Sequence, residues 1–169
     1  MKNIKFSRLF AAFAFVAILA LAGCTQNVEP EKNYYYVLPL EANDTLIADW
    51  VDSSSTHYVI TQNGFDNHGT FGNSYAGDNL VVLKSSDTAG IIFIKYTRAA
   101  NSDWTYTASA PDVGKWYAIS YKNLTASAIK ISGAYKQNGK TACETLKDAV
   151  KEFTVDNGYF ATYTDCVKQ

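Results

Sequence analysis

Short apolar and β-branched runs, separated by clusters of polar turn residues, extend over the middle of the chain. Alternation of apolar and polar positions predicts half-buried strands, and short continuous apolar runs predict strands buried on both faces. The runs predict strands at 34–38, 46–51, 58–61, 79–84, 90–97, 115–122 and 126–135. Turn residues lie between them at Asp52–Ser55, Asn63–Gly64, Gly77–Asn79 and Ser85–Asp87. Because no helical pattern separates these runs, the sequence predicts a mainly β protein, an antiparallel meander that closes into a barrel.

The longest predicted loop covers Ala99–Gly114 and carries Trp104 and Tyr106 among polar residues. Long loops on a β scaffold often hold functional residues. Trp104 could equally cap an open end of the barrel, and the sequence leaves both interpretations open.

The last thirty residues change in pattern and predict a helical tail from about residue 141. Thr141 and Glu144 have the spacing of a capping box. Apolar residues then recur at helical spacing, which predicts an amphipathic helix that packs on the barrel. These residues are Leu146, Ala149, Val150 and Phe153. A second short helix is expected over 159–167.

The N-terminal residues predict an export signal. Lys2, Lys5 and Arg8 precede Leu9–Leu21, a run of thirteen residues with no polar side chain. A bilayer span needs about 20 apolar residues, so this run is short for a transmembrane helix. A basic start, a short apolar run and small residues before a cleavage site are typical of a secretory signal peptide, here residues 1–23.

The end of this signal, Leu21-Ala22-Gly23-Cys24, resembles the lipobox of bacterial lipoproteins. The resemblance implies cleavage before Cys24 and a covalent diacylglycerol on its sulfur. Several acyl chains hold a protein stably on a bilayer. Residues 24–33 are then a lipidated tether and 34–169 the domain. Thr25 follows the cysteine where an Asp would signal inner-membrane retention, so we expect a lipid-anchored cell-envelope protein at the outer membrane or cell surface.

Two further cysteines, Cys143 and Cys166, lie in the tail. Export would place them in a compartment where disulfides persist. If the tail folds back near Asp156–Gly158, the two thiols meet, and a disulfide is expected. The alternative, a thiolate metal or catalytic site, has no histidine close by in sequence and no CxxC spacing.

Charge and motif content argue against several classes of function. The formal net charge is −1, and removal of the signal takes three of the 15 basic residues, so a nucleic-acid partner is not expected. His57 and His68 are the only histidines, and no metal-binding or nucleophile motif accompanies them. Asp49 and Asp52 are not expected to form a catalytic carboxylate pair, because they would point to opposite faces of a strand. We therefore expect no enzyme, no catalytic residue, no metal and no cofactor other than the diacylglycerol on Cys24.

Aromatic residues make up 14% of the chain, which suits either a core of large rings or a binding surface. The segment Ala48-Asp49-Trp50, followed by a meander, resembles the start of a lipocalin-like barrel, with Ala48 where that family has Gly. Segments from Gly90 to Val167 resemble small spirochaete lipoproteins. The resemblance implies location and fold style, and no catalytic residue. Expected inward positions are Trp50, Tyr58, Ile92, Ile94 and Tyr96.

The sequence therefore predicts a non-enzymatic binding module for a small apolar ligand or envelope component. Its candidate ligand-binding residues are Trp50, Tyr58, Tyr96 and Trp104. An eight-stranded barrel has room to hold one small ligand. The alternative is a surface-exposed interaction protein that binds host or partner proteins through aromatic patches.

Overall fold

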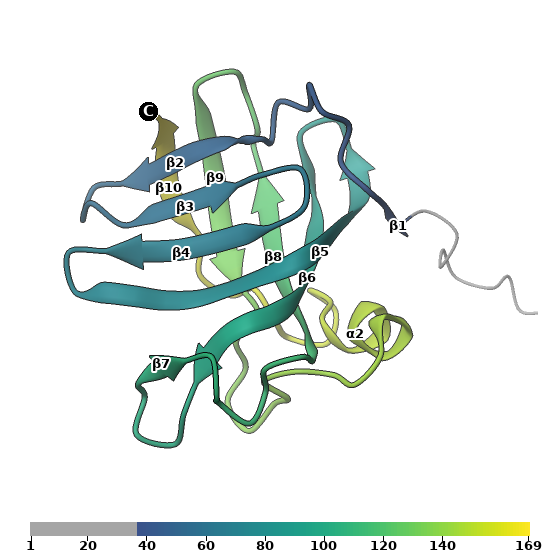
Figure 1. The fold of residues 1–169 in the computed structure, drawn as a ribbon. Coiled ribbons are helices and arrows are strands. Elements are labelled where there is room, and N and C mark those ends of the chain that lie inside the picture. Colours follow the sequence, from purple (N-terminus) through teal and green to yellow (C-terminus); the bar gives the residue numbers. More distant parts are fainter. Residues whose placement is uncertain (1–36) are drawn as a thin grey trace, which may run out of the picture. The chain divides into compact units, whose positions relative to one another are not determined.

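Ten strands and one helix form residues 37–169, the part of the chain that the computed structural model describes (Figure 1). The predicted signal peptide, Cys24 and the tether lie outside this part. The strands are β1 (Val37–Leu38), β2 (Ala48–Asp52), β3 (His57–Ile60), β4 (Phe65–Gly69), β5 (Gly72–Ser86), β6 (Ala89–Ala100), β7 (Tyr106–Thr107), β8 (Trp116–Lys122), β9 (Ala128–Gly133) and β10 (Thr164–Lys168). The helix is α2 (Leu146–Glu152).

Eight strands close into an antiparallel barrel. Around the barrel they follow the order β5, β4, β3, β2, β10, β9, β8, β6, and β6 pairs back onto β5. Consecutive barrel strands are all neighbours in the sheet, and the closure pairs the last strand, β10, with the first, β2. The predicted antiparallel meander barrel is thus confirmed. The short strands β1 and β7 pair with β5 and β6 outside the closed ring.

The sequence prediction of a second short helix over 159–167 was wrong, because the end of this segment forms the closing strand β10. Cys166 pairs with Asp52 of β2 and with Ile129 of β9. Without β10, β2 and β9 would each leave a row of unpaired backbone groups at an open edge. Pairing with these two edges makes the segment a strand, because its own local sequence pattern is weak.

The predicted amphipathic helix is present, but it begins later than the capping box indicated. The N-cap is Thr145, whose Oγ1 accepts a hydrogen bond from the Asp148 backbone N–H at 3.1 Å. Thr141 instead donates its hydroxyl to Asp112 at 2.6 Å. The apolar stripe is confirmed, since Ala149 and Phe153 are fully buried.

The long strand β5 contradicts the turn predicted at Gly77–Asn79. This polar stretch lies inside β5, where the register with β6 shifts between Asp78 and Val81. Asn79 adopts a positive φ of 53° there, a conformation that Asn tolerates better than most residues. The shift is a β-bulge, so the strand bends instead of ending.

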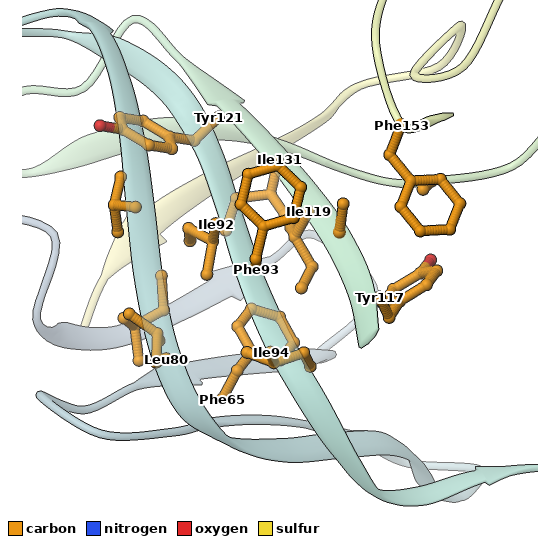
Figure 2. Close-up of a cluster of buried hydrophobic side chains, with 14 of the residues drawn as sticks. Phe65, Leu80, Ile92, Phe93, Ile94, Tyr117, Ile119, Tyr121, Ile131 and Phe153 are labelled. Atoms are coloured by element: carbon orange, nitrogen blue, oxygen red, sulfur yellow. The ribbon is translucent and has the colours of Figure 1, made fainter. Parts of the chain in front are cut away.

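The barrel interior is filled by one continuous cluster of buried apolar side chains (Figure 2). Trp50 is fully buried, and its indole N–H donates to the Leu46 carbonyl at 2.9 Å. Of the expected inward positions, Trp50, Ile92, Ile94 and Tyr96 are buried and Tyr58 is half-buried. Within residues 37–169, no helix has the length and apolar character needed to cross a membrane.

Candidate functional site

One end of the barrel gathers tyrosines and polar side chains, whereas the rest of the interior is mostly apolar. At this end, which we call the mouth, β2, β4, β6 and β9 finish and β3, β5, β8 and β10 begin. Because side chains alternate between the two faces of a strand, pairing register identifies the inward residue nearest the mouth on each strand. These eight residues, the mouth layer, are Asp52, Tyr58, Asn67, Tyr75, Tyr96, Tyr117, Gly133 and Thr164.

Three tyrosines of the mouth layer pack against one another. The Tyr96 and Tyr117 rings stack with centroids 4.8 Å apart, and Tyr75 meets Tyr117 edge-on at 5.2 Å. Phe65 stacks on Tyr75 at 5.5 Å, which joins the cluster to the apolar core. Burial is the main cause that raises the pKa of all three phenols above the ordinary value. They therefore stay neutral at physiological pH and offer ring faces and hydroxyls without charge.

Gly133 makes room for two of these hydroxyls. A Cβ placed on Gly133 would lie 2.6 Å from the Tyr117 hydroxyl oxygen and 3.3 Å from that of Tyr75. Any larger residue would displace the Tyr117 side chain. The two phenol hydroxyls can converge on the backbone of β9, because the last residue of this strand has no side chain.

Two neighbouring pockets open at the mouth and share Tyr75, Tyr106 and Tyr117. The first, which we call the Trp104 pocket, has a volume of about 390 Å³. Its walls also include Tyr96, Ala99, Ala100, Trp104, Pro111, Asp112, Ala134 and Thr141. The second, the Asn67 pocket, has a volume of about 330 Å³. Its walls also include Tyr58, Asn67, Ser74, Ile131, Ser132, Gly133, Tyr135, Thr162 and Thr164. Both volumes lie at the small end of the range for ligand sites.

Trp104 is held at the tip of a tight turn beside its pocket. Its backbone N–H donates to the Asn101 carbonyl at 3.0 Å, and the Asn101 N–H donates to the Thr105 carbonyl at 2.7 Å. Trp104 has a φ of +65°, and 77% of its surface is exposed. Such a backbone conformation is unfavourable for a bulky residue and is often found at functional sites. The turn keeps a large ring on the solvent side of the pocket.

Asp112, the only charged residue that lines the Trp104 pocket, is already paired with a cation outside the pocket. Its carboxylate lies 3.2 Å from the Lys115 ammonium and accepts the Thr141 hydroxyl at 2.6 Å. The remaining walls are aromatic rings, small apolar residues and neutral polar groups. The pocket thus suits an uncharged, largely apolar ligand.

The structure brings together some of the predicted ligand-binding residues and separates others. Tyr96 and Trp104 line the same pocket, and Tyr58 lines the adjacent Asn67 pocket. Trp50 lies on the first barrel strand, in the apolar core, and lines neither pocket. Sequence reasoning missed Asn67, because no strand was predicted between residues 61 and 79, where β4 lies.

A larger groove of about 700 Å³ lies along the pairing of β10 with β2 and β9, and it is a weaker candidate than the mouth. Outward-facing residues of these strands line it, among them Lys130 and Asp165, which form an ion pair at 2.6 Å. It has no cluster of aromatic rings and no convergent set of unpaired polar groups. We therefore place the candidate site at the mouth.

The two histidines lie side by side on the outside of the barrel. His57 and His68 are paired in the β3–β4 register, and their rings stack at 5.0 Å. The Nδ1 atom of His57 lies 2.9 Å from Asp49, and that of His68 lies 2.8 Å from Asp66. Asp66 also accepts from Arg98 of β6 at 3.1 Å. These contacts link four strands at the rim of the mouth. No group of three or more metal-ligating side chains occurs in the region the structure covers.

The expected disulfide between Cys143 and Cys166 was wrong, because both residues are buried free thiols. Cys143 pairs with Trp116, at the beginning of β8, whereas Cys166 pairs with Ile129 of β9, beyond the other end of β8. The seven residues of β8 span about 20 Å from first to last, at about 3.3 Å per step. A disulfide needs Cα atoms within about 7 Å. Insertion of β10 into the sheet therefore keeps the thiols apart.

No protein-family model, no curated protein and no solved structure matches this chain.

Proposed function

We propose that the barrel is a non-enzymatic binding module that holds a small apolar ligand in the Trp104 pocket. The observation that carries the proposal is the arrangement of Tyr96, Tyr117 and Trp104 around one opening of about 390 Å³, whose single charged wall residue is paired with Lys115. Apolar pockets with a few fixed polar groups are the usual form of small-molecule sites. The unfavourable backbone of Trp104 supports a role for this ring outside folding.

Binding of a neutral apolar dye tests this proposal directly. We would titrate the full chain with N-phenyl-1-naphthylamine and follow the rise in dye fluorescence. Trp104→Ala is expected to weaken binding about fivefold or more, because it removes one aromatic wall. Phe71→Ala is the matched control, since Phe71 is fully exposed at the same end and lines neither pocket. Equal affinity for all three proteins, or no fluorescence rise, would contradict the proposal.

The proposal includes attachment to the cell envelope through a diacylglycerol on Cys24, most consistent with the outer membrane or cell surface. Its support is the lipobox-like Leu21–Cys24 after a basic and then apolar stretch. Phase separation in Triton X-114 tests it: the wild-type chain is expected in the detergent phase and Cys24→Ser in the aqueous phase. Partition of both into the aqueous phase would contradict the anchor.

A second candidate function is the binding of a partner protein through exposed aromatic residues. Phe71, Trp104, Tyr106 and Tyr135 are exposed at the mouth, Tyr106 on the short strand β7 and the other three in connections. Exposed aromatic clusters are favoured at protein interfaces. This candidate predicts that Phe71→Ala and Tyr135→Ala reduce capture of a partner while dye binding is unchanged. The first candidate predicts the reverse dependence, on Trp104 and Tyr96.

A further inference from the structure

Asn67 is a buried mouth-layer residue whose side-chain amide makes no hydrogen bond within the described residues and is reached only through the pocket that it lines. Only 5% of its surface is exposed. Its backbone pairs with β3 in the sheet, and its backbone carbonyl also accepts from Arg98 at 3.4 Å. Within the described residues, nothing donates to or accepts from the side-chain amide, which can donate two hydrogen bonds and accept two. Polar side chains on such buried residues are usually paired within the protein, so this amide, open only to the pocket, is available for a ligand.

The fold aims this amide into the Asn67 pocket. Asn67 lies opposite Tyr58 in the β3–β4 register, and both face into the barrel. The pocket that they line has a volume of about 330 Å³. Asn67 stands above Phe65 on β4, so the amide lies at the boundary between the apolar core and the opening.

Hydroxyl groups line the same pocket as the amide, and none of the residues that line it is charged. Tyrosines 58, 75 and 117 contribute phenols, and Thr164 lies on β10 across the barrel. Burial raises the pKa of Tyr58 and Tyr75 above the ordinary value, so their phenols stay neutral. Gly133 leaves open the space in which the Tyr75 and Tyr117 hydroxyls converge. The pocket thus presents ring faces together with neutral groups that both donate and accept hydrogen bonds.

We propose that the Asn67 pocket binds an uncharged ring that carries several hydroxyl groups, of the monosaccharide class. A pyranose ring donates and accepts hydrogen bonds at its edge and presents C–H groups at its faces. These properties match an amide, several phenols and aromatic ring faces in one small pocket. A charged ligand would find no counter-charge among the residues that line it. This inference concerns a different pocket from the apolar dye site and does not depend on it.

The test measures binding of methyl β-D-glucopyranoside to the full chain, purified in a zwitterionic detergent that contains no sugar. The readout is the ¹H–¹⁵N signal of the Asn67 side-chain amide, which Asn67→Leu identifies by its absence. The sugar is expected to shift this signal in a saturable way at millimolar concentration. Cyclohexanol, a ring of similar size with one hydroxyl, is expected to bind far more weakly, because sites built for hydroxyls reject analogues that lack them.

Two leucine variants separate recognition from folding. Asn67→Leu is expected to weaken sugar binding about tenfold or more, as measured by ligand-observed NMR, because the amide is lost. It should fold about as well as the wild type, since the change removes no side-chain hydrogen bond within the described residues. Asn73→Leu, the same change on the exposed start of β5, is expected to bind like the wild type.

Tyr58→Phe provides a second variant that keeps the ring and removes one hydroxyl, so that the test does not depend on the folding of Asn67→Leu. It is expected to weaken sugar binding about threefold. Trp104→Ala is expected to leave sugar binding unchanged, which separates this site from the apolar pocket. No shift of the Asn67 amide with the sugar, or equal affinity of the wild type, Asn67→Leu and Tyr58→Phe, would overturn the proposal.

Discussion

The two ends of the barrel interior differ in chemistry although the same eight strands build both. Away from the mouth, the inward side chains are apolar and fully buried, including Leu46, Trp50 and Ile92. At the mouth, the inward positions are four tyrosines, an asparagine with an unbonded amide, a glycine, a threonine and Asp52, whose carboxylate accepts from the Tyr58 hydroxyl at 3.4 Å. One end therefore provides most of the hydrophobic stabilisation, and the other provides groups that a ligand can contact. A strand can contribute to both ends, because side chains two residues apart lie at different depths in the barrel but point to the same face of the sheet.

Two tryptophans show the same contrast between the apolar end and the mouth. Trp50 is fully buried and hydrogen-bonded to Leu46, whereas Trp104 is mostly exposed in an unfavourable backbone conformation. The first ring stabilises the fold. The second contributes little to it and is available to the pocket. The same substitution at both positions separates stability from binding.

The largest expected effect is at the apolar end. Trp50→Ala should lower the free energy of unfolding by about 3–5 kcal/mol, because it leaves a cavity in a packed core. Urea unfolding followed by circular dichroism measures the loss, and Trp50→Phe is the control that keeps most of the apolar volume. A loss below about 1 kcal/mol for Trp50→Ala would mean that the mouth, and not this end, stabilises the barrel.

Alkaline pH should have the next largest effect, and it acts on both ends. Burial raises the pKa of Tyr121, away from the mouth, to about 12, and that of Tyr75 and Tyr96 well above the ordinary value. A group whose pKa is raised on folding stabilises the folded state below its unfolded pKa, near 10. That contribution is lost as pH rises toward the folded pKa. Stability should therefore fall between pH 10 and 12, by roughly 1–3 kcal/mol for Tyr121 alone.

Thermal unfolding from pH 8 to 12, with phenolate absorbance at 295 nm, measures this dependence. Tyr121→Phe should make the decline shallower. A melting temperature that stays constant across this range would show that the phenols are less buried than the structure indicates.

The helix near the mouth should depend on Thr145 by a smaller amount. Thr145→Ala removes the N-cap of α2 and should cost about 1 kcal/mol in urea unfolding. Thr141→Ala is the matched control and should cost less, because it removes one exposed hydrogen bond to Asp112. The opposite ranking would restore the capping box at Thr141 that the sequence suggested.

Trp104→Ala should change the free energy of unfolding by no more than about 0.5 kcal/mol, because the side chain is mostly exposed. Differential scanning calorimetry beside Trp50→Ala makes the comparison within one experiment. A loss of several kcal/mol would identify Trp104 as part of the core and remove the contrast between the two ends.

A reducing agent should have no effect on the melting temperature, since Cys143 and Cys166 are free thiols. Burial raises the pKa of Cys166 to about 12, so iodoacetamide should label it slowly in the native protein and fully after unfolding. Peptide mapping without reductant should find both residues alkylated after unfolding. Recovery of a Cys143–Cys166 linked peptide would contradict the position of β10.

The sequence alone determined the elements that a local pattern encodes. Alternation over 115–122 and 126–135 predicted β8 and β9 nearly to their ends, and helical spacing predicted the buried face of α2. Trp50 and Tyr96 were predicted to face inward for the same reason. In such segments, each residue's side of the element follows from its neighbours in sequence, so periodicity is sufficient.

Tertiary structure alone decided how the barrel closes and what the mouth contains. Thr164–Lys168 became a strand because β2 and β9 left open edges, and that placement separated Cys143 from Cys166. Asn67 lies in a polar stretch that resembles a loop, and only its register opposite Tyr58 turns it toward the pocket. These features depend on contacts between residues far apart in the chain. Local propensity carries no information about such pairs, whose energy comes from edges and faces that exist only once the sheet has formed.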